Sequence, residues 1–179
     1  MEKYFSSDTS ARKVRPRPQG LKPSSLNPTA VIDASSENEW AYFDFSSGGV
    51  VRIDDPSSLE WDVAFRRNKI ISNGGKTNPQ GQVAVVNLGN RDINDIKIAP
   101  EGGYTADTLV WGENTNKAIG KWYNYDTRSS ILASKGDVYI FRTIDNGYAK
   151  MRILSYYCQG RSACYTIEYS YDEEGVFDN

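Results

Sequence analysis

The chain has 179 residues, of which 39% are hydrophobic and 12% aromatic, and its 21 Lys or Arg and 23 Asp or Glu give a net charge of −2. This length and composition predict one globular domain with enough apolar surface to bury a core. The chain has no histidine, which excludes Ser-His-Asp and Cys-His catalytic systems and any haem or zinc site that depends on histidine.

Residues 1–28 are predicted to form an extended N-terminal arm, and residues 29–179 a separate β domain. The arm contains four of the seven prolines and carries six Lys or Arg against two Asp or Glu, so it is basic while the rest of the chain is acidic. Because it is too poor in apolar residues to order itself, we expect it to lie extended on a partner. The residues expected to bind that partner are Tyr4, Phe5, Arg12, Lys13, Val14, Arg15, Arg17 and Leu21.

The first half of the β domain shows alternating apolar residues interrupted by turn residues. The stretch 40–53 alternates aromatic and β-branched residues around Ser46–Gly49, which predicts a hairpin. Residues 61–71, WDVAFRRNKII, are predicted to be one strand that ends at Asn73-Gly74-Gly75, and residues 82–88 another.

Residues 90–135 differ from their surroundings, because they alternate weakly and are rich in Asn, Gly, Asp and Thr. We expect an excursion from the sheets that contains one or two short helices, at residues 93–97 and 105–111, although neither has a clear apolar face.

The C-terminal part is predicted to be a meander of three antiparallel strands. Residues 137–155 form two alternating runs around Asp145-Asn146-Gly147, and a second turn at residues 159–163 leads into CYTIEYSY. With its many short strands and regular turns, the chain is predicted to be all-β, with two antiparallel sheets.

The two cysteines, Cys158 and Cys164, flank the second turn of this meander. Their spacing permits a cross-strand disulfide, which would indicate an oxidising compartment, and it equally permits two buried thiols. Two cysteines without histidine are too few for a closed zinc site.

Several stretches in order resemble the HmuY-like family of exported haem-binding lipoproteins: YFDFSSGGVV, WDVAFRRNKIISNGG, GKWYNYD, VYIFRTIDNGYAKMRILSYY and YTIEYSY, within residues 40–171. The resemblance implies a hand-like β fold whose middle region closes over haem. In such a fold Trp61, Val63 and Phe65 would pack in the core, while Asp62 would pair with Arg66 or Arg67 at its edge.

The haem ligands of the family do not carry over. The characterised relatives use histidine or methionine as axial ligands from the middle region, and residues 98–135 contain neither. Met151 alternates with core residues of the meander, which predicts packing. The remaining candidates for ferric iron are Tyr104, Tyr123 and Tyr125. We therefore expect no cofactor, with haem as the disfavoured alternative.

Three functions are compared on this basis. The first, which we favour, is a non-catalytic structural or assembly subunit that docks through its arm on a larger membrane-associated complex of the respiratory or photosynthetic type. The second is a haemophore-like haem-binding protein. The third is a carboxylate-based enzyme such as a glycosidase, which only scattered loop acids support.

The expected partners are protein subunits and, near a membrane, anionic lipid headgroups. Nucleic acid is not expected, because the body is acidic and would repel phosphate. No apolar run approaches the roughly 20 residues that span a bilayer. The family resemblance implies an extracytoplasmic protein, extrinsic to a membrane, whereas the absence of an apolar signal segment before the arm indicates a cytoplasmic one.

Overall fold

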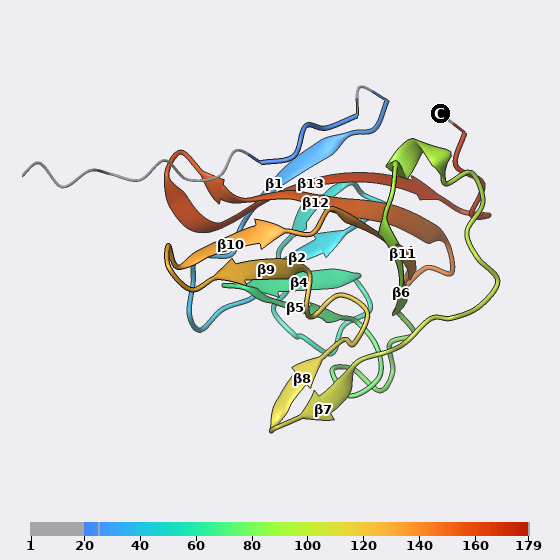
Figure 1. The fold of residues 1–179 in the computed structure, drawn as a ribbon. Coiled ribbons are helices and arrows are strands. Elements are labelled where there is room, and N and C mark those ends of the chain that lie inside the picture. Colours follow the sequence, from blue (N-terminus) through green and yellow to red (C-terminus); the bar gives the residue numbers. More distant parts are fainter. Residues whose placement is uncertain (1–19, 25, 179) are drawn as a thin grey trace, which may run out of the picture.

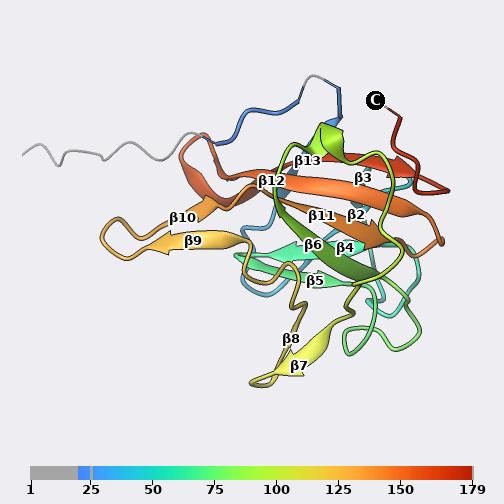
Figure 2. The same ribbon diagram turned by 45° about the vertical axis from the view of Figure 1, so that its right-hand side comes forward.

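The computed structural model describes residues 20–24 and 26–178, which form a nearly all-β domain (Figure 1). Most of the strands belong to two large antiparallel sheets that face each other, and two short hairpins project from this pair (Figure 2). The predicted all-β class is confirmed. Among the residues described, no helix is long and apolar enough to cross a membrane.

The larger sheet contains the predicted meander, which is confirmed. Its five strands lie in the order β1-β13-β12-β11-β6 and are antiparallel. Their bounds are β1 Thr29–Asp33, β6 Ala84–Asn90, β11 Asp137–Arg142, β12 Tyr148–Cys158 and β13 Arg161–Asp172. Asn146 has a φ of 71°, the left-handed conformation that a tight turn between β11 and β12 requires.

The second sheet has four strands in the order β3-β2-β4-β5. Their bounds are β2 Ala41–Asp44, β3 Gly49–Val51, β4 Val63–Arg66 and β5 Lys69–Ser72. The prediction of a single strand over residues 61–71 is wrong, because a turn at Arg67 and Asn68 divides it into β4 and β5. Arg67 adopts a φ of 53° there, which only the surrounding structure can impose on a residue with a side chain.

The excursion between β6 and β11 contains two hairpins and one short helix. The 3-10 helix η1, Ile93–Asp95, lies within one of the two predicted helical stretches. The other prediction is wrong, because part of residues 105–111 forms β7, Thr108–Val110, which pairs with β8, Glu113–Thr115. The second hairpin joins β9, Tyr123–Asp126, to β10, Ile131–Ser134.

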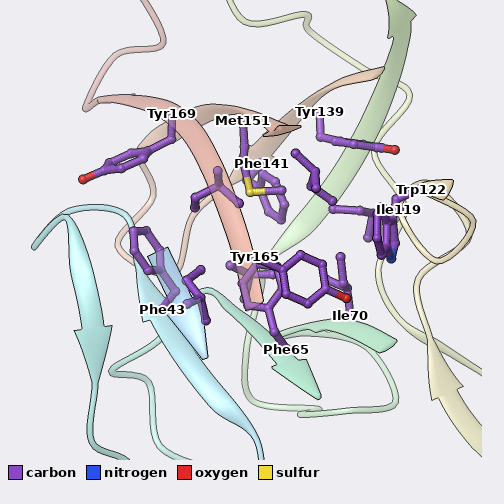
Figure 3. Close-up of a cluster of buried hydrophobic side chains, with 14 of the residues drawn as sticks. Phe43, Phe65, Ile70, Ile119, Trp122, Tyr139, Phe141, Met151, Tyr165 and Tyr169 are labelled. Atoms are coloured by element: carbon purple, nitrogen blue, oxygen red, sulfur yellow. The ribbon is translucent and has the colours of Figure 1, made fainter. Parts of the chain in front are cut away.

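The core lies between the two large sheets and is rich in aromatic side chains (Figure 3). Phe65 of β4 packs on Tyr165 of β13 with ring centroids 4.9 Å apart, and Phe45 packs on Phe141 of β11 at the same distance. Met151 of β12 is fully buried among them, so its predicted role in packing agrees with its position. Each such buried side chain contributes about 1.5–3 kcal/mol through the hydrophobic effect.

Asp62 connects the two sheets at the end of the core. Its fully buried carboxylate accepts hydrogen bonds from the backbone N–H groups of Phe45, at 2.9 Å, and Ile144, at 2.7 Å. Burial raises the pKa of Asp62 to about 7. The predicted pairing of Asp62 with Arg66 or Arg67 at the core edge is wrong, since the backbone satisfies this carboxylate and Arg66 instead lies over the ring of Trp40.

The described end of the predicted arm runs along the domain's own larger sheet. The Leu21 N–H donates to the Leu154 carbonyl at 2.8 Å, and the Ser24 N–H donates to the carboxylate of Glu168 at 2.8 Å. Glu168 is fully buried and also binds Arg152 at 2.7 Å. Leu21, one of the residues predicted to bind a partner, therefore contacts its own domain. The other seven, Tyr4, Phe5, Arg12, Lys13, Val14, Arg15 and Arg17, lie outside the described residues.

Candidate functional site

A cleft lined with tyrosines lies where the β9–β10 hairpin faces the β4–β5 turn and the end of β12. It has a volume of about 330 Å³, and a neighbouring hollow of about 450 Å³ shares three of its lining residues, so the two form one surface feature. We call this feature the tyrosine cleft. Its lining residues are Arg67, Asn68, Tyr123, Tyr125, Ser129, Ser130, Ile131, Leu132, Tyr156, Tyr157 and Ser162.

The β9–β10 hairpin presents its tyrosines to the cleft because it is anchored by a core residue. Trp122, which precedes β9, is fully buried, and its Nε1 donates to the Asn68 carbonyl at 3.0 Å. Tyr123 and Tyr125 are two positions apart in β9, so strand geometry puts both on one face. The Leu132 N–H donates to the Tyr157 hydroxyl at 2.9 Å, which ties β10 to β12.

The tyrosines differ in how far they are exposed. Tyr156 is only 5% exposed and packs against Trp122 and Tyr165, with ring centroids 5.5 and 5.2 Å away. Tyr125 is 54% exposed, and the Tyr123 hydroxyl accepts a hydrogen bond from Asn68 Nδ2 at 3.0 Å. The cleft thus has an aromatic floor continuous with the core and an accessible aromatic wall.

Arg67 is the one charged residue among those that line the cleft. Its backbone N–H donates to Ala34, at 2.7 Å, and its carbonyl accepts from the Tyr165 hydroxyl, at 2.8 Å. These bonds hold the left-handed backbone, and Nη1 donates to the Ser35 carbonyl at 3.1 Å. The fold therefore fixes the backbone of Arg67, and one hydrogen bond to Ser35 orients its guanidinium.

The phenols on the floor of the cleft stay protonated at neutral pH. Burial raises the pKa of Tyr156, and the nearby Arg67 charge only partly offsets it. Burial likewise raises the pKa of Tyr165 well above its ordinary value. The described lining contains no Lys, Asp or Glu, so Arg67 contributes its one side chain of that charged class.

The structure brings together two of the three tyrosines singled out as haem candidates. Tyr123 and Tyr125 both line the cleft, whereas Tyr104 lies elsewhere, beneath Arg142. The Tyr104 hydroxyl is buried, and burial raises the pKa of this residue to about 12, which disfavours the phenolate that iron would need. Within the described residues, no group of three or more His, Cys, Asp or Glu side chains could hold a metal ion.

Sequence patterns missed the residues that complete the cleft. Arg67 and Asn68 lie within the predicted strand 61–71, and Tyr156 directly follows the predicted alternating runs of residues 137–155, so neither pattern indicates a site residue. The polar triplet Arg66-Arg67-Asn68 within an apolar run is the one local signal that could have indicated a turn.

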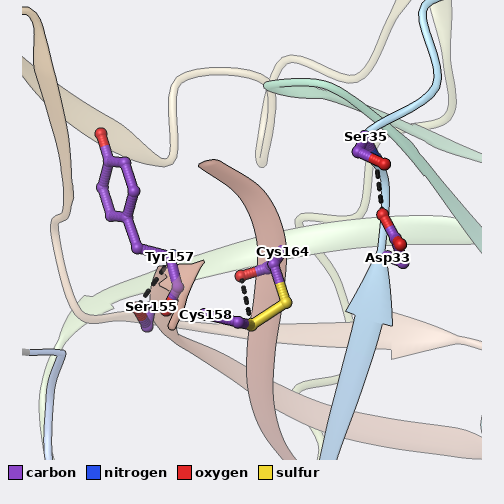
Figure 4. The surroundings of a disulfide bond; sticks show 6 residues. All are labelled: Asp33, Ser35, Ser155, Tyr157, Cys158 and Cys164. Atoms are coloured by element: carbon purple, nitrogen blue, oxygen red, sulfur yellow. Dashed lines mark hydrogen bonds between the residues drawn. A yellow bond between two sulfur atoms is a disulfide. The ribbon is translucent and has the colours of Figure 1, made fainter. Parts of the chain in front are cut away.

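Cys158 and Cys164 are joined by a disulfide next to the cleft (Figure 4). Their Cα atoms are 5.4 Å apart, and the bond closes the turn between β12 and β13. Ser162, which lines the cleft, lies within the segment that the disulfide closes, and Tyr157, which also lines it, directly precedes Cys158. The disulfide therefore constrains the backbone that carries one rim of the cleft.

Residues 36–171 match the family model HmuY, described as HmuY protein, which covers most of the chain. No curated protein matches the chain in sequence. An apo HmuY analog from Tannerella forsythia has a similar fold, with a TM-score of 0.66 and 13% identity over 82% of this chain and 95% of that chain.

Two further solved structures are similar. A proposed HmuY-like haem-binding protein from Bacteroides vulgatus ATCC 8482 has a TM-score of 0.65 and 22% identity over 90% of this chain and 100% of that chain. A proposed lipoprotein from Bacteroides fragilis NCTC 9343 has a TM-score of 0.60 and 19% identity over 90% of this chain and 97% of that chain.

The hypothesis of a structural or assembly subunit of a respiratory or photosynthetic complex is wrong. The matching family model is that of HmuY, and the similar structures are described as an HmuY analog, a haem-binding protein and a lipoprotein. The hypothesis rested on the arm, whose described end lies on the domain's own sheet.

Proposed function

Because the chain belongs to the HmuY family, we propose that it is a non-catalytic binding protein that takes haem or a closely related tetrapyrrole into the tyrosine cleft. The observation that carries this proposal is an accessible aromatic wall beside a single fixed cation, in a cleft without carboxylates among its lining residues. Its volume of about 330 Å³, with the adjoining hollow, suits a ligand that lies partly outside the protein.

The tetrapyrrole ring suits this lining. Tyr123, Tyr125 and Leu132 offer ring faces, edges and aliphatic carbon, which pack well against a flat aromatic ligand. The floor below them is already filled by Trp122 and Tyr156, so the ligand would gain contact area without rearranging the core.

The cleft offers fewer ligands for a haem iron than contacts for the tetrapyrrole ring. The chain has no histidine, and Met151 is buried in the core, so the donors in the cleft that suit ferric iron are phenolic oxygens. Of the four tyrosines in the lining, Tyr156 is buried and the Tyr157 hydroxyl accepts a hydrogen bond from β10, which leaves Tyr123 and Tyr125 as the candidates. If haem binds, these tyrosines would hold its iron through oxygen. The expectation that the chain holds no cofactor, drawn from the missing axial ligands, stays a prediction. We depart from it by proposing haem, the disfavoured alternative.

Two features support a non-catalytic role outside the cytoplasm. The described residues offer no nucleophile paired with a general base in the cleft, whose titratable lining residues are arginine and tyrosine. The Cys158–Cys164 disulfide suits an oxidising compartment, in keeping with the Bacteroides fragilis lipoprotein of similar fold.

The test is an absorbance titration with hemin, repeated with metal-free protoporphyrin IX. We expect saturable one-to-one binding of both, and a hemin spectrum without six-coordinate low-spin character. Replacing Tyr123 and Tyr125 together by Phe should weaken hemin binding by about tenfold or more while sparing the metal-free ring, since one good iron ligand exceeds about 1.4 kcal/mol.

The matched control is Tyr104→Phe, which removes a phenol outside the cleft. It should leave both affinities unchanged. The proposal would be overturned if neither compound bound saturably, or if a low-spin hemin complex survived the loss of the phenols of Tyr123 and Tyr125.

A further inference from the structure

The fixed cation of the cleft indicates which ligands it selects. Arg67 is the single charged residue that lines either part of the cleft, and no Asp or Glu is among the lining residues. An arginine beside uncharged lining residues is available to pair with an anionic group of a ligand.

The backbone around Arg67 is arranged to hold this residue in place. A non-glycine residue with a φ of 53° is uncommon, and it persists here because hydrogen bonds to Ala34 and from Tyr165 fix both peptide groups. Glycine or asparagine would suit the turn better on conformational grounds. The position therefore carries a long cationic side chain although its backbone conformation favours glycine or asparagine.

The guanidinium keeps donors for a ligand. It makes one side-chain hydrogen bond that the structure describes, from Nη1 to the Ser35 carbonyl, out of five N–H donors. A planar guanidinium is suited to a carboxylate, which accepts two parallel hydrogen bonds. Burial raises the pKa of the neighbouring Tyr156, so this phenol is uncharged at neutral pH and does not pair with the guanidinium as an anion.

We infer that the tyrosine cleft selects planar aromatic ligands that carry a carboxylate, and that Arg67 binds this carboxylate while the tyrosine wall contacts the ring. The inference rests on the proposed function and adds a specificity to it. A carboxylate is favoured over a phosphate because the one cation that lines the cleft matches a single negative charge.

The experiment compares metal-free protoporphyrin IX, which has two carboxylates, with its dimethyl ester, which has none. Without iron, neither compound depends on tyrosine ligation. The wild-type chain should bind the diacid at least about tenfold more tightly than the ester, as expected for a charge-assisted hydrogen-bonded pair. Arg67→Gln should reduce this preference to within about threefold, chiefly by weakening diacid binding.

Two further variants sharpen the result. Arg66→Gln removes the adjacent cation, which lies over Trp40 and not in the cleft, and should keep the wild-type preference. Arg67→Lys keeps the charge without the planar donor pair and should give an intermediate preference. Unchanged ester affinity in Arg67→Gln would show that the cleft itself remains intact.

The outcomes separate the two proposals. If the wild-type chain binds diacid and ester equally well, the role of Arg67 is overturned while tetrapyrrole binding stands. Loss of the preference in Arg66→Gln, with the preference retained in Arg67→Gln, overturns the role of Arg67 as well. If neither compound binds the wild-type chain, the proposed function fails and the inference fails with it.

Discussion

Two regions of this molecule are rich in aromatic residues but differ in how far their rings are exposed to solvent. Between the large sheets, Phe65 and Phe141 are fully buried, and their rings fill the space between the layers (Figure 3). In the tyrosine cleft, Tyr125 remains 54% exposed. Trp122 joins the regions, because it is buried in the core and directly precedes β9. Aromatic content alone therefore does not decide whether rings form a core or a binding surface.

The arrangement of the strands explains this difference in exposure. The β9–β10 hairpin forms a two-stranded sheet of its own within the described chain, so no second sheet covers its tyrosine face. In the core, by contrast, aromatic rings from the two sheets meet, as Phe65 does with Tyr165 and Phe43 with Tyr169. The hairpin is held by hydrogen bonds at its base and edge and is left open along its length.

The largest expected contrast is in stability. Phe65→Ala should lower the free energy of unfolding by about 3–5 kcal/mol, because it leaves a cavity between the sheets. Tyr125→Ala should change it by less than about 0.5 kcal/mol, as for an exposed side chain. Urea denaturation at neutral pH measures both. Similar losses for the two variants would mean that the hairpin is part of the cooperative core.

We expect the pH dependence of stability to come from Asp62, at the end of the core, and not from the tyrosine cleft. Asp62 has a pKa of about 7 in the folded chain against an ordinary value of 3.8, so the folded state binds this proton more tightly than the unfolded state does. Its contribution is then fully present below about pH 4 and is lost as pH rises through 7. The full shift corresponds to about 4 kcal/mol at 1.36 kcal/mol per pKa unit.

Asp62→Asn isolates this effect, because asparagine does not titrate. Relative to the variant, the wild-type chain should lose unfolding free energy between pH 4 and pH 8, measured by urea denaturation across that range. A difference between the two chains that stays constant with pH would show that Asp62 does not titrate in this window.

Loss of the disulfide should have a smaller effect on stability. It should also lower stability more than it lowers ligand affinity. Replacing Cys158 and Cys164 by Ser should cost about 2 kcal/mol of stability, the chain-entropy value for so short a loop. Porphyrin affinity should fall by less than about threefold, since Arg67 and Tyr123 are held by other contacts. Thermal melting and a porphyrin titration of the same variant test this. A larger loss of affinity than of stability would make the disulfide part of the site.

The smallest effect is expected from Tyr104→Phe, which removes a buried hydroxyl without a hydrogen-bond partner in the described structure. Stability should change by less than about 0.5 kcal/mol or rise slightly, because an unsatisfied polar group is lost. Differential scanning calorimetry measures this change. A marked loss of stability in the variant would mean that the Tyr104 hydroxyl has a hydrogen-bond partner after all.

Sequence patterns predicted the parts of the fold in which alternation and turn residues agree. The β11–β13 meander was predicted because Asn146-Gly147 interrupts two alternating runs, and local preference and tertiary structure coincide there. The division of residues 61–71 was missed, since the turn at Arg67 is held by contacts with Ala34 and Tyr165 that are distant in sequence.

The candidate site was only partly predictable, because some of its residues meet only through contacts that are distant in sequence. Tyr123 and Tyr125 stood out as an aromatic cluster within one strand, so their common face could be foreseen. Arg67 and Tyr156 reach the cleft only because the β4–β5 turn and β12 fold against the hairpin. The partners of Asp62 are backbone groups 17 and 82 residues away, which no residue pattern indicates.

The most direct test of the binding site is a two-dimensional NMR titration of protein with isotope-labelled tyrosine rings, using metal-free protoporphyrin IX. Tyr→Phe variants assign the signals. The account predicts that the signals of Tyr123, Tyr125 and Tyr156 shift saturably, while those of Tyr104 and the core residue Tyr139 stay in place. Saturable shifts centred on Tyr104, or no shift in the cleft at saturating porphyrin, would contradict it.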